Sequence, residues 1–194
     1  MLQRGFSAGR ALRAGGSLGA QMPPYPIRVF GDAVLRQPAL PVVDIDGDLA
    51  KLAEDMLETM YAAPGIGLAA PQLGIQRRLF VYDIGEGPHA IVNPTLSEHR
   101  GEWEYVEGCL SVPELHWPIL RPKEVHLTGW DLDGKELSIE ADELLARLFQ
   151  HEVDHLNGVL LLERLDSGQR KAAMRTLRRR AIGATEPGLA TDRG

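Results

Sequence analysis

One helix at the centre of the protein can be read from residues 141–157, ADELLARLFQHEVDHLN. Acidic residues at its start favour a helix N-terminus, and Gly158 favours its end. At about 100° per residue, His151 and His155 lie within about 40° of each other on the same side of the helix. Two imidazoles one turn apart can bind one metal ion, and the HExxH spacing is typical of catalytic metal sites. The stretch therefore predicts a helix that carries a metal.

Glu152 lies on the apolar side of this expected helix, between the directions of Leu148 and Leu145. Burying an unpaired carboxylate costs several kcal/mol, and a neighbouring metal-bound water would offset that cost. Glu152 is therefore a candidate general base and acid beside the ion; the alternative is a buried ion pair with an arginine or lysine. Asp154 is expected to form a structural ion pair instead of binding the metal. The opposite side of the helix is predicted to be polar and carries Glu143, Arg147, Gln150 and Asp154.

A catalytic ion needs a third protein ligand and one open position. No histidine follows His155, and the nearest downstream candidate is Glu163. The chain has one cysteine, Cys109, in the segment Glu107-Gly108-Cys109-Leu110-Ser111. A thiolate is a soft metal ligand, although a lone cysteine is more often a small buried apolar side chain. Cys109 is the candidate third ligand, and a single cysteine allows no internal disulfide, which favours a reducing cytoplasm.

The composition is that of an average single-domain protein. Of 194 residues, 44% are hydrophobic and 25% are charged, which excludes collagen-like, coiled-coil and wholly disordered chains. The longest apolar runs are a few residues, far below the roughly 20 needed for a transmembrane helix. Neither a membrane nor DNA is expected as a partner.

Positive charge is concentrated in two segments. Residues 1–20 contain three arginines and residues 170–180 contain six basic residues, with no acid in either segment. These nine leave 12 basic residues against the 27 acidic ones in the rest of the chain. Residues 1–24 are interpreted as a flexible extension, with organellar targeting by residues 1–20 as an alternative. The folded domain is expected to span 25–182, and residues 183–194 are expected to be disordered.

Residues 167–181 are predicted to form a C-terminal helix that docks through Ala173, Met174, Leu177 and Ala181. Its basic residues are either a solvated face or a contact surface for RNA.

The remaining pattern indicates an α+β fold. An amphipathic helix begins at Asp46 or Asp48 and ends before Pro64-Gly65. Strands are expected at 79–84 and 90–92, and a hairpin pairs 125–131 with 137–139 around Asp133-Gly134. Because strands and helices do not alternate regularly, we expect short antiparallel sheets and hairpins packed around the central metal-binding helix, with the C-terminal helix outside.

Three segments together resemble the peptide deformylase family, in its order and at plausible separations. They are Gly65-Ile66-Gly67-Leu68-Ala69-Ala70-Pro71-Gln72, the Cys109 segment and Gln150-His151-Glu152-Val153-Asp154-His155. The similarity covers about residues 25–180. It implies that Cys109, His151 and His155 bind one divalent ion, Fe²⁺ in the native bacterial enzymes, with Zn²⁺ or another divalent transition metal also suited to this ligand set.

The resemblance also implies a reaction, hydrolysis of the N-formyl group from the initiator methionine of nascent polypeptides, with release of formate in the cytoplasm. Glu152 would transfer the proton, and the tetrahedral oxygen would accept hydrogen bonds from the Gln72 amide and the Leu110 backbone N–H. Substrate-binding roles are implied for Ile66 and Gly67 along the cleft and for Tyr105, Leu144 and Leu148 around the methionine side chain. Arg147 departs from the pattern, since many members carry an apolar pocket residue there.

Two other functions remain open at this point. A zinc metalloprotease would use the same HExxH helix, but it usually takes its third ligand from downstream, where no histidine occurs. A non-enzymatic ribosome-binding or RNA-binding protein would act through the basic residues 170–180. An enzyme of the resembled family could also contact the ribosome through this segment.

Overall fold

The computed structural model describes residues 25–181. The expected N-terminal extension 1–24, its alternative as a targeting segment, and the expected tail 183–194 lie outside the described residues. The domain boundaries therefore stay predictions. Within 25–181, no helix combines the length and the apolar character needed to cross a membrane.

The described chain forms an α+β fold, as expected from the sequence. Strands β1, β2, β3, β6 and β7 form one antiparallel sheet in that order, and β4 and β5 form a second sheet. In chain order the elements are η1 (Ala33–Arg36), α1 (Gly47–Ala62), β1 (Gly67–Ala69), η2 (Ala70–Leu73), β2 (Leu79–Tyr82), β3 (His89–Arg100), β4 (Trp103–Cys109), β5 (Val112–Arg121), β6 (Glu124–Trp130), β7 (Glu136–Asp142), α2 (Glu143–Leu156), η3 (Leu161–Arg164) and α3 (Ser167–Ala181), where η marks a 3₁₀ helix.

The helix and hairpin expected from local signals are both present. Asp46 is the N-cap of α1, and its carboxylate accepts a hydrogen bond from the Leu49 N–H at 2.9 Å. The hairpin joins β6 to β7 around Gly134, which has a φ of 74°. The strand predicted at 90–92 is longer than expected, because β3 continues to Arg100 through two irregularities in its pairing with β6.

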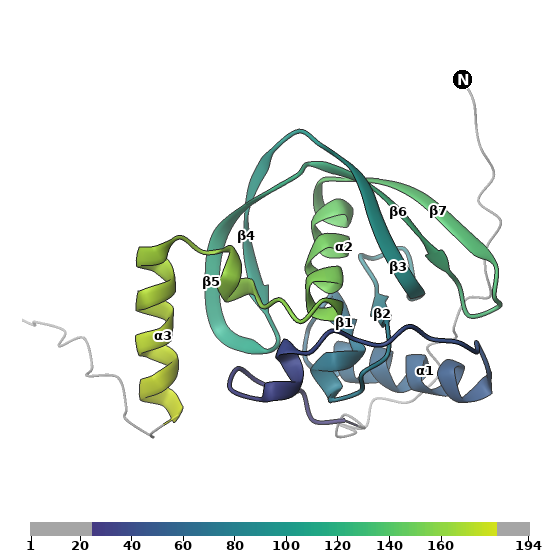
Figure 1. The fold of residues 1–194 in the computed structure, drawn as a ribbon, viewed down its shortest axis with the longest axis horizontal. Coiled ribbons are helices and arrows are strands. Elements are labelled where there is room, and N and C mark those ends of the chain that lie inside the picture. Colours follow the sequence, from purple (N-terminus) through teal and green to yellow (C-terminus); the bar gives the residue numbers. More distant parts are fainter. Residues whose placement is uncertain (1–24, 182–194) are drawn as a thin grey trace, which may run out of the picture.

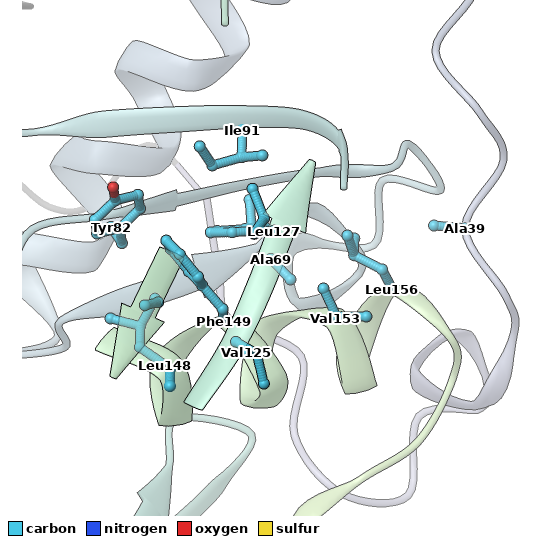
Figure 2. Close-up of a cluster of buried hydrophobic side chains, with 13 residues drawn as sticks. Ala39, Ala69, Tyr82, Ile91, Val125, Leu127, Leu148, Phe149, Val153 and Leu156 are labelled. Atoms are coloured by element: carbon cyan, nitrogen blue, oxygen red, sulfur yellow. The ribbon is translucent and has the colours of Figure 1, made fainter. Parts of the chain in front are cut away.

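Helix α2 lies at the centre of the molecule, with the five-stranded sheet on one side and β4 and β5 on another (Figure 1). Its apolar side chains fill the core beneath the larger sheet (Figure 2). The fully buried Phe149 ring lies 5.9 Å from the Phe80 ring and 5.3 Å from the Tyr82 ring, measured between centroids. Burial of such aromatic side chains is a large stabilising contribution, and it holds α2 in a defined rotation.

The side of α2 that was predicted to be polar is polar, but most of it is buried. Arg147, Gln150 and Asp154 are only 3%, 7% and 8% exposed, while Glu143 at the start of the helix is exposed. The second sheet covers this side, and its backbone accepts hydrogen bonds from the buried groups. Arg147 donates to the Ile119 carbonyl at 3.0 Å. A helical wheel records polarity only, so it cannot reveal that polar groups are buried with partners.

Helix α3 lies beside β5 at one edge of the molecule (Figure 1). As expected, Ala173 and Leu177 are buried, and Met174 is partly buried against the same cluster. This cluster also contains Cys109, so the helix docks behind the predicted metal ligand. The six basic residues of α3 are exposed and comprise Arg170, Lys171, Arg175, Arg178, Arg179 and Arg180.

Candidate active site

The three predicted metal ligands converge. Cys109 Sγ lies 3.3 Å from His155 Nε2, which lies 3.2 Å from His151 Nε2. All three atoms are within 4.8 Å of one another. The two histidines come from successive turns of α2, and Cys109 comes from the end of β4, 42 positions earlier than His151. One sulfur and two imidazole nitrogens aimed at one point suit a divalent transition metal.

A buried carboxylate orients the first histidine. Glu107 Oε2 accepts a hydrogen bond from His151 Nδ1 at 3.0 Å. Arg121 donates to the same carboxylate through Nε at 2.6 Å and Nη2 at 3.0 Å, and Arg147 donates as well. Burial opposes ionisation of Glu107, but the hydrogen bonds from His151 and Arg121 outweigh it and lower its pKa to about 2. Since an ionised carboxylate can only accept, Nδ1 carries the proton and Nε2 keeps its lone pair for a metal.

The thiol of Cys109 is prepared for ionisation in the same way. Burial alone would raise its pKa, but the neighbouring His155 and His151 rings lower the pKa well below its ordinary value. A thiolate beside two imidazoles is the donor set that a soft transition metal requires. The chemistry of the donors therefore fits a bound metal ion.

Glu152 has the environment expected of a proton-transfer group. Its side chain is buried, and Oε2 has no hydrogen-bond partner among the described residues. Burial raises the pKa of the carboxyl to about 7, although the charges of His151 and His155 act in the other direction. No arginine or lysine in the described part of the chain pairs with Glu152, so the alternative of a buried ion pair was wrong. A carboxyl that titrates near neutral pH can both accept and release a proton there.

Gln72 lines a cavity beside these groups, and two hydrogen bonds hold its side-chain amide. Its Oε1 accepts the Ala69 N–H at 2.8 Å, and its Nε2 donates to Ser111 Oγ at 3.2 Å. This bonding assigns the orientation of the amide, because the backbone N–H at Ala69 needs an acceptor. Leu110 lies in the turn between β4 and β5 at the wall of the same cavity.

A cavity of about 660 Å³ opens beside these groups. Its volume is in the range of small-molecule and peptide side-chain sites. Leu148 is buried in its wall, while Ile66 and Leu144 are 46% and 40% exposed. Ten of the eleven predicted site residues line it, and the eleventh, His155, is buried. The ten are Ile66, Gly67, Gln72, Tyr105, Cys109, Leu110, Leu144, Leu148, His151 and Glu152.

The ion-pair network around α2 was missed in the sequence. Asp154 accepts from Arg121 at 2.8 Å and from Arg164 at 3.0 Å, as the expected structural ion pair. Arg147, placed above on the polar side of the helix, stacks 4.9 Å from the Trp103 ring and lies 5.8 Å from the Tyr105 ring. The signal available in the sequence was the number of charged residues in and around the Cys109 and HExxH segments. Residue spacing alone does not show which of these charges pair.

The fold and the site fit the class of metal-dependent hydrolases that carry an HExxH helix, with an upstream cysteine beside the two histidines. Glu163, the downstream candidate, instead bonds Arg36 at 2.9 Å. The chain matches the family described as Polypeptide deformylase over residues 24–171. It is 50% identical over 153 residues to a peptide deformylase of Acidothermus cellulolyticus, which covers 79% of this chain and 85% of the relative.

Solved structures agree with the sequence comparison. A peptide deformylase from Legionella pneumophila superimposes with a TM-score of 0.77 at 40% identity, covering 84% of this chain and 99% of that one. Another, from Synechococcus elongatus in complex with actinonin, has a TM-score of 0.77 at 39% identity, with 86% and 94% coverage. This chain belongs to the polypeptide deformylase family and removes the N-formyl group from nascent peptides. The two alternatives, a zinc metalloprotease and a non-enzymatic RNA-binding protein, were therefore wrong.

Proposed function

We propose that Cys109, His151 and His155 hold a ferrous ion and that Glu152 transfers the proton during deformylation. The observation that carries this proposal is the convergence of one sulfur and two nitrogens within 4.8 Å, next to a buried carboxyl oxygen that has no hydrogen-bond partner within residues 25–181. The ion would supply Lewis acidity and lower the pKa of water bound to it. Zinc fits the same ligands, so the donor set favours a divalent transition metal and does not distinguish iron from zinc.

The chain's own residues account for the remaining steps. Glu152 would accept a proton from the attacking water and pass it to the departing amine, since its pKa of about 7 suits both transfers. The Gln72 amide and the Leu110 backbone N–H would donate to the oxygen that develops negative charge. Removing one such donor commonly lowers turnover about 100-fold to 1,000-fold.

The substrate peptide would lie along β1. This strand pairs with β2 only, so its other edge faces the cavity without a strand partner in the described chain. The backbone of Ile66 and Gly67 could therefore bind an extended peptide as an added strand. The methionine side chain would enter between Leu144, Leu148 and Tyr105, of which Leu148 lies deepest.

Anaerobic purification followed by metal analysis and a formate-release assay tests this proposal. We expect about one iron per chain and loss of activity when iron is removed, with recovery on adding ferrous ion. Equal activity in the metal-free protein would refute it. Recovery with zinc but not with iron would refute the choice of ferrous ion while leaving the ligand set intact.

We further propose that the enzyme works in the cytoplasm and contacts the ribosome through α3. The six exposed basic residues of this helix support an electrostatic contact with RNA. Deleting the helix would uncover the buried Ala173 and Leu177, so charge substitution is the cleaner test. A variant with Arg175, Arg178 and Arg179 changed to Gln should hydrolyse a free formyl-methionyl peptide normally and lose affinity for ribosomes in cosedimentation. Undiminished cosedimentation would refute the contact.

A further inference from the structure

A second cavity, of about 460 Å³, lies on a different face of α2 from the catalytic cavity. The α2 residues in its wall are Gln150, Val153 and Asp154, with Asn157 just after the helix, whereas the catalytic cavity is lined by Leu144, Arg147, Leu148, His151 and Glu152. The reaction described above uses none of these four groups, although Arg121, which also lines the second cavity, supports the catalytic site through Glu107.

The second cavity carries an excess of positive charge. Arg78, Arg121 and Arg164 line it, and the acidic residue in its wall is Asp154. Asp154 already accepts hydrogen bonds from both Arg121 and Arg164. Arg121 also forms an ion pair with Glu107, which lines the catalytic cavity and pairs with Arg147 as well. Three arginines, Arg121, Arg164 and Arg147 of the catalytic cavity wall, therefore share two carboxylates, and Arg78 has none, so this group carries two more positive than negative charges.

Arg78 is the cation without a carboxylate. Its guanidinium donates to Asn157 Oδ1 at 2.9 Å and to the Pro94 carbonyl at 3.1 Å, and within residues 25–181 no carboxylate pairs with it. These neutral acceptors fix the guanidinium at the cavity wall without neutralising it. Burial lowers the pKa of Arg78, as expected for a partly desolvated cation that lacks a counter-ion. An anion in the cavity would provide the missing charge.

We propose that this cavity binds a phosphate group, either as free inorganic phosphate or as part of a small phosphomonoester. Arg78 and Arg164 would hold its oxygens, since a guanidinium fork matches the geometry of a phosphate. Arg164 has a half-exposed side chain that can contact a ligand while it keeps Asp154. His99 at the exposed mouth would add a further donor.

Isothermal titration of the metal-loaded enzyme with inorganic phosphate and with glycerol 3-phosphate tests the proposal. We expect saturable binding of one ligand per chain. Tighter binding of glycerol 3-phosphate would identify the phosphomonoester as the ligand class, and equal or weaker binding would identify free phosphate. Arg78→Gln should weaken binding at least about tenfold, because it removes the unpaired cation. Arg77→Gln is the matched control, because Arg77 is the exposed neighbour and does not line the cavity.

A second pair of variants guards against loss of folding in Arg78→Gln. Thr95 lies exposed at the cavity wall. Thr95→Glu should weaken phosphate binding about fivefold through charge repulsion, while the similarly sized Thr95→Gln should stay within about twofold of the original affinity. Peptide hydrolysis without phosphate should be unchanged in both. Absence of phosphate binding would overturn the proposal. Phosphate affinity equal to that of the parent enzyme in both Arg78→Gln and Thr95→Glu would also overturn it, because phosphate bound at the metal would respond to neither change.

Discussion

Because the carboxyl of Glu152 is buried, we expect its replacement to lower activity and to raise stability. Replacing it by Gln removes the proposed proton carrier and should lower turnover about 100-fold to 10,000-fold. The same substitution removes a charge that burial disfavours, as shown by the pKa of about 7. The metal-free variant should therefore be more stable than the metal-free parent at neutral pH.

The size and pH dependence of the effect follow from proton linkage. The pKa of Glu152 is raised in the folded state from the ordinary 4.5 to about 7. Below pH 4.5 the carboxyl is protonated in both states, so it carries no penalty. Between 4.5 and 7 the folded state holds more protons, and the free energy of unfolding falls as pH rises. Above 7 the full penalty is present, and at about 1.4 kcal/mol per pKa unit it amounts to about 3 kcal/mol.

Urea denaturation at pH 4.5 and pH 8, after chelation of the metal, measures this difference. Glu152→Gln should be more stable than the parent by about 3 kcal/mol at pH 8 and nearly equal to it at pH 4.5. Glu58→Gln, an exposed substitution on α1, is the control and should show no such change. A variant that is no more stable than the parent at pH 8 would show that the burial argument is wrong. Near-normal formate release would separately refute the proton-transfer role.

Three further substitutions test the site. Cys109→Ser should lose the bound ion and the activity together in metal analysis and a formate assay; full metal content would contradict ligation by the thiolate. Gly67→Ala should slow turnover at least about tenfold in steady-state kinetics, since the new Cβ would lie 2.9 Å from Glu152 Cδ and must displace it; an unchanged rate would mean that this carboxyl need not be held there. Leu148→Ala should lower the preference for formyl-Met over formyl-Ala peptides about tenfold, the usual value of lost apolar pocket contacts; an unaltered ratio would remove Leu148 from the methionine pocket.

The sequence alone determined the features that depend on local spacing. The i, i+4 histidines, the apolar position of Glu152 and the cap of α1 at Asp46 follow from helical geometry, because residues one turn apart must share a face. The hairpin around Asp133-Gly134 follows from turn chemistry in the same way. These signals were sufficient for the α+β class and for two of the three candidate ligands.

Only the tertiary structure decided how the distant charges combine. Pairing of β4 with β5 brings Cys109 and Glu107 against α2. The residue spacing within the Cys109 segment or within the helix does not predict this contact. The same packing buries Arg147 and Asp154, which helical spacing had placed only on the polar side of the helix. The free energy of a buried charge depends on the partners that other segments bring to it. For that reason the metal-binding helix could be read from one stretch of sequence, whereas the ion pairs around it could not.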